Sequence, residues 1–171
     1  LTWVVVYLVV GITGALVQPE LGQEPWYPAA AVGVGLLVIR GIRWWPAVLL
    51  CDVAVSLLQY REVVGGLVSG TCTALEIVLV ADLLRRLRFR PTFERPEDMV
   101  RLWLAGLIGA LFAASAGSGL LRWLDATDRD YWRTWLVWFV GDSTGVLLVG
   151  PIVLLLAQPH WLQQLRALRG P

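Results

Sequence analysis

Two acidic residues lie deep inside stretches that are otherwise apolar, and they are the residues of this sequence most able to do chemistry. Glu76 stands in SGTCTALEIVLVADLL, and Asp142 stands in WLVWFVGDSTGVLLVGP. A carboxyl group in such a stretch must be neutral, paired or in contact with water, and it usually faces a bundle interior or a water-filled cavity. We therefore expect Glu76 and Asp142 to point inward and to line a shared polar pocket.

The neighbours of Asp142 are residue types that bind small polar ligands or protons. Trp138 comes four residues earlier on the same helical face, and two hydroxyl side chains follow directly. Two interpretations stay open: a ligand-binding or signalling site, and a hydrogen-bond network with a purely structural role. The candidate site residues are Glu76, Asp142, Trp138, Ser143, Thr144 and Asp52.

Two further carboxyls lie nearer the ends of apolar segments. Asp52 stands close to an interface where water could reach it, so a structural and a functional role are equally open. Asp82 has Arg85 and Arg86 three and four residues later, a spacing that predicts a local ion pair on one helix.

Catalytic motifs are absent from the sequence. It has no HExxH, no Ser-His pair at membrane depth, no phosphate-binding glycine loop and no cysteine cluster. Cys51 and Cys72 lie in apolar segments, where packing is the expected role, and His160 follows Pro159 in an interfacial position. We therefore expect no catalytic residue, no metal ligand and no cofactor in this segment.

The elements that must position these side chains are transmembrane helices. The 171 residues are 57% hydrophobic and 16% charged, with a mean hydropathy of +0.67, too apolar for a soluble domain of this length. The apolar runs predict an all-α integral membrane protein with a six-helix transmembrane bundle. The predicted segments are 1–17, 26–39, 46–58, 63–84, 99–121 and 135–157.

Two of these segments are short. The second and third hold about 12 and 13 apolar residues, roughly 18 to 20 Å of helix. They could form a short or shallow hairpin, or extend across the membrane through snorkelling flanks. The other segments are long enough to cross the hydrocarbon core. The domain organisation predicted is a membrane domain over 1–157 and a cytoplasmic amphipathic connector over 158–171. This connector could be an interfacial anchor or a helix that transmits movement.

Arginine distribution predicts the orientation. Ten arginines gather on one predicted face and four on the other, so the first face should be cytoplasmic, together with both termini. The near-neutral charge gives no reason to expect a nucleic-acid partner. Small residues recur every four positions in two segments, which favours packing within the monomer over a homodimer, although both stay open. These residues are Gly66, Gly70, Ala74, Gly106, Ala110, Ala114 and Ser118.

Five stretches occur in an order that resembles a known family. They are WYPAAA from Trp26, RGIRWWP from Arg40, TALEIVLVADLLR from Thr73, FERPED from Phe93 and WFVGDSTGVLLVGP from Trp138. Together they resemble the bacterial membrane-associated sensor domain of type one, the MASE family. The last stretch meets every fixed position of a pattern that resembles W-x-x-G-D-x-x-G-V-L-x-x-x-P. The chain departs from the family at Tyr27, where a second proline is usual.

The resemblance implies both site residues and a function. Such domains normally precede a cytoplasmic histidine kinase, diguanylate cyclase or phosphatase module, and the expected role is a sensory input domain in a bacterial inner membrane. The implied partners are the lipid bilayer, that output module, and an unknown small-molecule ligand or membrane protein. The alternatives are the substrate-binding subunit of a vitamin-type transporter and a passive membrane anchor. The positions carried over are Trp26, Pro28, Gly41, Arg43, Pro46, Glu76, Trp138, Gly141, Asp142, Gly145 and Pro151.

Overall fold

The computed structural model describes residues 2–17, 26–60 and 62–158, and every regular element in these ranges is helical. The predicted all-helical class is therefore confirmed. A 3-10 helix, η1 (Ile42–Trp44), leads into α3, and a π-helical turn, η2 (Gly145–Val149), joins α6 to α7, so the described residues form six helical rods. The α-helices are α1 (Thr2–Val17), α2 (Pro28–Arg40), α3 (Trp45–Gln59), α4 (Val63–Arg86), α5 (Pro96–Trp123), α6 (Tyr131–Thr144) and α7 (Gly150–Leu156).

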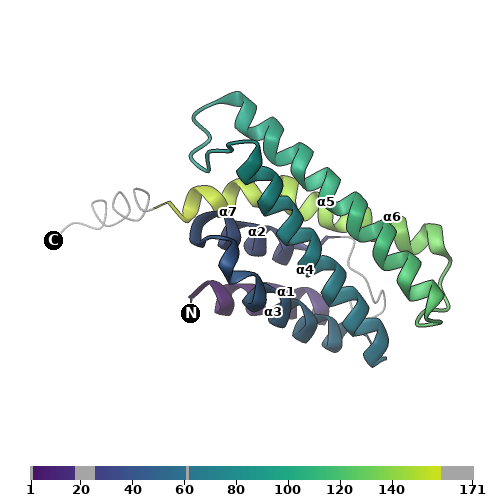
Figure 1. Cartoon of the computed structure of the whole chain (residues 1–171). Helices are drawn as coiled ribbons and strands as arrows, with labels where there is room; N and C mark the ends of the chain where they lie inside the picture. The colour runs from purple at the N-terminus through teal and green to yellow at the C-terminus, as the bar shows by residue number, and fades with distance from the viewer. Residues whose placement is uncertain (1, 18–25, 61, 159–171) are drawn as a thin grey trace.

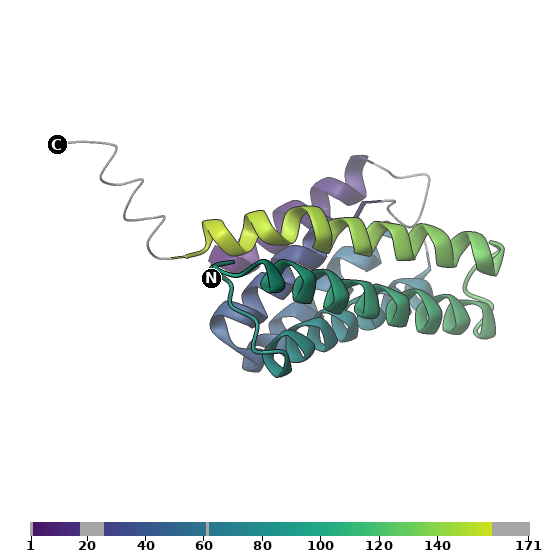
Figure 2. The same cartoon turned by 90° about the horizontal axis from the view of Figure 1, so that it is seen from above.

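Most of the rods pack against their neighbours along the chain. α3 lies against α4, α4 against α5, and α5 against α6, while α1 covers α2 and α3 (Figure 1). The rod made of α6, η2 and α7 runs beside α5 (Figure 2). The helix α2 contacts α1, α4, η2 and α7 and so joins both ends of the described sequence.

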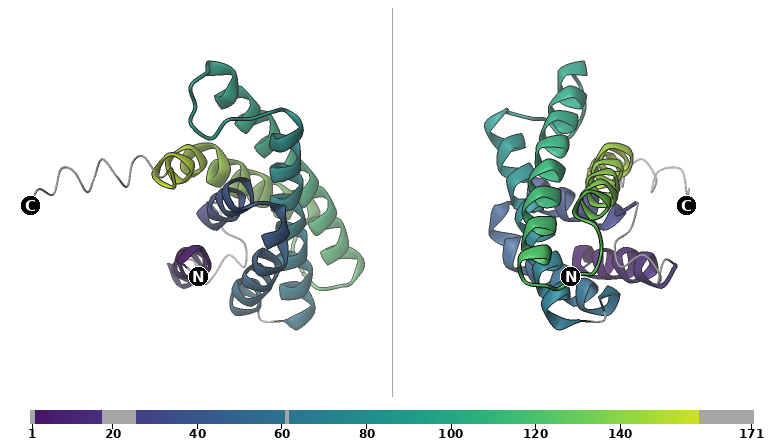
Figure 3. Two further views of the ribbon diagram at one scale, coloured as in Figure 1. Left: turned by 60° about the vertical axis from the view of Figure 1, so that its left-hand side comes forward. Right: turned by 90° about the vertical axis from the view of Figure 1, so that its right-hand side faces the viewer.

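The helix α2 is the central helix of the bundle. Every residue from 29 to 37 is buried, and Figure 3 shows α2 among the other rods. A helix that is apolar on all sides is stable when it is enclosed by neighbours. Alanine and glycine predominate in its first half, which lets those neighbours approach closely.

Four rods among the described residues are long and apolar enough to cross a membrane. They are η1 with α3, α4, α5, and the rod from Tyr131 to Leu156. The third predicted segment is thus longer than expected, because η1 adds a turn before Trp45 and gives 18 continuous residues. By contrast α1 has 16 described helical residues, about 24 Å, so it belongs with α2 among the shorter apolar helices rather than with the long spans.

Small residues bring the rods together within one chain. An added Cβ on Gly70 would lie 2.6 Å from the Cα of Val53 on α3, and one on Gly106 would lie 2.8 Å from Cγ1 of Val146. These contacts use both predicted small-residue stripes for packing inside the monomer.

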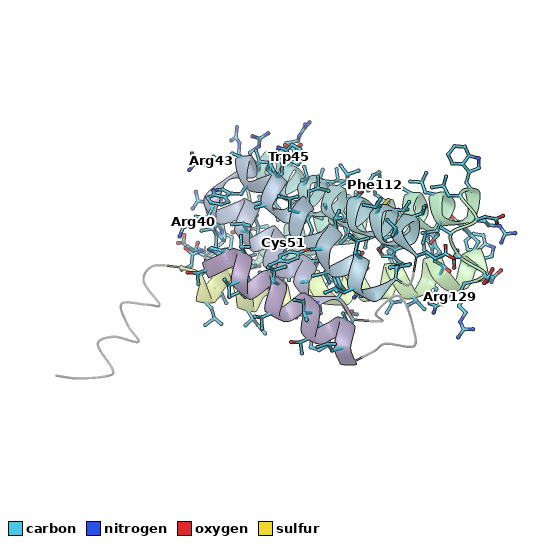
Figure 4. The ribbon with its side chains drawn as sticks, turned by 90° about the horizontal axis from the view of Figure 1, so that it is seen from below. Arg40, Arg43, Trp45, Cys51, Phe112 and Arg129 are labelled. Atoms are coloured by element: carbon cyan, nitrogen blue, oxygen red, sulfur yellow. The ribbon has the colours of Figure 1, made fainter. Side chains whose placement is uncertain are left out.

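Arginines lie at both ends of the bundle. Arg40 and Arg43 lie at one end and Arg129 lies at the other (Figure 4). The helix α1 begins and α7 ends at the Arg40 end, where the connection between α4 and α5 also lies (Figure 1). The start of α1 and the end of α7 therefore lie on one side of the described bundle. The predicted connector lies outside the described residues except for Gln158, and so does His160.

Two carboxyls near the Arg40 end are structural. Asp82 accepts hydrogen bonds from Arg85 at 2.7 Å and from Arg86 at 2.5 Å, which confirms the predicted local ion pair. The helix α5 begins at Pro96, three residues before the predicted segment, and Asp98 is fully buried in its first turn. It accepts hydrogen bonds from the Arg101 guanidinium at 2.8 Å and the Arg90 backbone at 3.3 Å. Asp98 therefore fixes the loop between α4 and α5.

Candidate functional site

Glu76 and Asp142 approach each other in the centre of the bundle, from α4 and α6. Their side chains are 0% and 2% exposed, and the two carboxyls interact electrostatically. Glu76 faces Gly109 on α5, where an added Cβ would lie 3.0 Å from Glu76 Cγ. The structure thus brings these two predicted site residues together, and close packing on the α5 side holds Glu76 towards α6.

Asp142 is held between the tryptophan one turn before it and the start of the π-helical turn. The indole N-H of Trp138 is directed at the Asp142 carboxyl, and the Trp138 ring is buried against Gly117. An added Cβ on Gly117 would lie 2.1 Å from Trp138 Cη2, so α5 must carry glycine there. The tryptophan is therefore wedged between α5 and α6 and orients Asp142.

The two hydroxyl residues after Asp142 differ in their availability. Thr144 Oγ1 donates to the backbone carbonyls of Val140 at 2.8 Å and Gly141 at 3.0 Å, so this hydroxyl is bonded to its own helix. Ser143 is buried, and its Oγ has no hydrogen-bond partner among the described residues. Of this predicted pair, only Ser143 has a free polar atom for a ligand.

Asp52 joins the cluster from α3 through a tyrosine. The Tyr27 hydroxyl donates a hydrogen bond of 2.8 Å to Asp52 Oδ1, and Asp52 is fully buried rather than reached by water. Its carboxyl also interacts electrostatically with those of Asp142 and Glu76. The Tyr7 hydroxyl of α1 lies close to Asp52 and Tyr27, is buried, and makes no hydrogen bond of ordinary geometry in the described structure.

The backbone before α2 is docked directly onto the last rod. The Tyr27 N-H donates to the Gly141 carbonyl at 3.1 Å, and an added Cβ on Gly145 would lie 2.1 Å from the Tyr27 carbonyl oxygen. Gly141 lies ten residues after Tyr131, about 15 Å along a 26-residue rod, so α2 begins at mid-depth in the bundle. This explains why α2 is short.

These contacts account for the spacing of the W-x-x-G-D-x-x-G stretch. Trp138 packs on Gly117, Gly141 and Gly145 receive the Tyr27 backbone, and Asp142 faces Glu76 from the same turn. The π-helical turn that follows ends two residues before Pro151, where the missing N-H and the bulk of the ring would disturb a regular α-helix.

The other positions carried over by the resemblance lie away from the carboxyls. Pro28 begins α2, and Pro46 lies in the first turn of α3. Gly41 ends α2 with φ +96, a conformation that favours glycine, and its N-H donates to the Leu37 carbonyl at 3.0 Å. Trp26 and Arg43 are exposed. Their roles are in helix ends and interfaces rather than in the central site.

Sequence reasoning missed Tyr7 and Tyr27 as members of the cluster. A signal for Tyr7 existed, because a tyrosine in the middle of an apolar segment needs a hydrogen-bond partner, whereas one at an interface does not. Tyr27 stood beside Trp26 and looked like part of an interfacial aromatic pair. Its real depth depends on the contact with Gly141, which joins residues 114 positions apart in the chain.

The cluster is acidic and has no cationic partner in the described structure. The ion pairs found there involve Asp82, Glu94 and Asp98, and none involves Asp52, Glu76 or Asp142. Both Glu76 oxygens and one oxygen each of Asp52 and Asp142 lack a hydrogen bond. Within the described ranges, no group of three acidic, histidine or cysteine side chains is placed to hold a metal ion. Such a cluster can bind protons or a small polar donor.

Comparison with known proteins gives a family match over nearly the whole chain. The family model MASE1 matches residues 1–170. The probable diguanylate cyclase DgcE of Escherichia coli (strain K12) is 28% identical over 141 residues, which cover 80% of this chain but 12% of that protein. No solved structure matches.

Proposed function

Since this chain belongs to the MASE1 family, we propose that it detects a stimulus at the buried carboxyl cluster and passes it to a cytoplasmic output module. It is a membrane domain of a signalling protein, and diguanylate cyclase, histidine kinase and phosphatase are the candidate outputs. The similarity to DgcE favours a cyclase. We assign the domain to the bacterial inner membrane with both termini cytoplasmic, on the arginine distribution. The segment itself carries out no catalysis in this proposal.

One observation carries the proposal: Glu76 and Asp142 form a polar contact between α4 and the rod that ends the described bundle. A change in this contact alters how α6 is held relative to α4. Because α6, η2 and α7 are one continuous rod, a shift near Asp142 reaches its Leu156 end.

Neutral substitutions in the intact protein test the sensory role. We expect Glu76→Gln and Asp142→Asn to change output activity, while the exposed carboxyl variants Glu62→Gln and Asp128→Asn leave it unchanged. Output activity that is the same in all four variants would reject the sensory role and leave the passive anchor.

A second experiment tests whether the segment after α7 transmits movement to the output module. We expect insertions of one, two, three or four residues after Leu168 to change output activity with the length inserted, because a rigid helical connection transmits rotation. Activity that does not depend on insertion length would contradict coupling through this segment.

A further inference from the structure

The geometry points to a proton as the ligand of this site: we infer that Glu76 and Asp142 together bind one exchangeable proton. This deepens the proposed function and rests on it only for the link to output. Two carboxylates buried side by side repel each other strongly, and a shared proton between them removes that repulsion. The described structure offers no cation to do so instead.

Each helix packed around Glu76 and Asp142 contributes residues to their surroundings. The α3 helix contributes Asp52, the segment before α2 contributes Tyr27, and α1 contributes Tyr7. From α6 the Trp138 indole faces Asp142, and α5 presents Gly109 to Glu76. Each charged group facing the pair is therefore a carboxyl.

Asp52 is arranged differently from the pair. It accepts the Tyr27 hydrogen bond at 2.8 Å, and a hydroxyl donor of this kind stabilises an anion. Both oxygens of Glu76 are buried without any such donor. Hence the anionic charge belongs on Asp52, and the proton belongs on the Glu76–Asp142 pair.

The independent observation that supports a site here is the Tyr7 hydroxyl. It is 1% exposed, lies against Asp52 and Tyr27, and makes no hydrogen bond of ordinary geometry within the described ranges. Such a hydroxyl can turn from one acceptor to another as charge moves within the cluster.

Release of the proton has a mechanical consequence. When the carboxyl O-H bond breaks and the proton leaves to water, the pair carries two negative charges that repel each other. Glu76 cannot withdraw towards α5, because Gly109 and Val80 are closely packed there. Asp142 lies three residues before the π-helical turn, a conformation that often marks places where a helix adjusts. The repulsion is therefore relieved by movement of α6.

Infrared spectroscopy of the intact protein in lipid vesicles tests proton binding directly. We expect a carbonyl stretch from a protonated carboxyl that is lost as the pH rises, and we expect Glu76→Gln and Asp142→Asn each to remove or shift it. The matched control is Asp98→Asn, because Asp98 is equally buried but paired with Arg101, and this variant should leave the band unchanged.

Isotope labelling keeps the test decisive where a variant fails to fold. Carbon-13 in the carboxyl of glutamate alone, or of aspartate alone, should shift the same titrating band of the wild-type protein. No titrating band sensitive to these labels, or a band removed by sodium chloride but not by choline chloride at constant pH, would overturn the proton assignment.

The two proposals fail in different ways. In one outcome the infrared band titrates, but output activity is unchanged by pH, by Glu76→Gln and by Asp142→Asn. This outcome supports proton binding and rejects the sensory role. Output activity that changes in both variants without any titrating band supports the sensory role and rejects the proton.

Discussion

Gly145 and Tyr27 lie so close that a single methyl group would not fit between them: an added Cβ on Gly145 would lie 2.1 Å from the Tyr27 carbonyl oxygen. The neighbouring hydrogen bond from the Tyr27 N-H to the Gly141 carbonyl holds the same segment in place. These contacts fix the start of α2 at the level of Asp142, which is why the tyrosine hydroxyl reaches Asp52. The acidic cluster therefore depends on glycines as much as on carboxyls.

Gly145→Ala should separate α2 from the last rod. The obstacle is a backbone carbonyl, which cannot turn aside like a side chain, so we expect a loss of about 1 to 3 kcal/mol in the free energy of unfolding. The matched control is Gly119→Ala on α5, where an added Cβ meets nothing within 4 Å. That variant should be neutral or stabilising by about 0.5 to 1 kcal/mol. The unfolding midpoint in detergent measures both, and equal midpoints would contradict the docking of Tyr27.

Tyr27→Phe should weaken the cluster without changing its packing. The variant removes the 2.8 Å hydrogen bond to Asp52 and leaves a buried carboxyl short of a donor, which costs about 1 to 3 kcal/mol. Tyr131→Phe is the control, because the Tyr131 ring packs edge-on against Trp132 at 5.1 Å near the end of the bundle. We expect Tyr27→Phe to have a lower unfolding midpoint in detergent than Tyr131→Phe. A Tyr27→Phe protein as stable as Tyr131→Phe would show that this hydrogen bond contributes nothing.

The sequence predicted those features that depend on local pattern. Apolar runs predicted the helices, and the i to i+3 and i to i+4 spacing predicted the ion pairs of Asp82. It also singled out Glu76 and Asp142, because a carboxyl in an apolar run is rare. What it missed depends on contacts between distant segments: the depth of Tyr27 is set by Gly141, and the Tyr27 hydroxyl in turn reaches the buried Asp52. The short length of the second segment left a shallow hairpin open, whereas the structure makes α2 a central helix.

Topology can be checked with reporter fusions. The Arg40 end of the bundle holds the connection between α4 and α5, and the opposite end holds Arg129 (Figure 4). On the arginine distribution we expect a fusion after Pro91 to be active in the cytoplasm and a fusion after Asp128 to be active outside it. A periplasmic signal from the first or a cytoplasmic signal from the second would reverse the assigned orientation.

The contact between Gly117 and Trp138 predicts a strong coupling between two substitutions. Alone, Gly117→Ala forces its new methyl group to within 2.1 to 2.2 Å of the Trp138 ring, and we expect it to cost about 1 to 3 kcal/mol. The atoms in the way are those of the six-membered ring, namely Cη2, Cζ3 and Cζ2. Phenylalanine is shorter than tryptophan, so Gly117→Ala should cost much less in a Trp138→Phe background.

A double-mutant cycle measures this coupling. Unfolding midpoints of the wild type, the two single variants and the double variant should give an interaction energy of about 0.5 to 3 kcal/mol. Gly119→Ala combined with Trp138→Phe is the matched control. It should be additive, since the added Cβ at position 119 has no neighbour within 4 Å. Trp138→Phe also removes the indole N-H from Asp142, so a change in output activity caused by this variant and not by Gly119→Ala would connect the wedge to the acidic site. Additive energies for Gly117→Ala with Trp138→Phe would show that α5 and α6 are not held together by this contact.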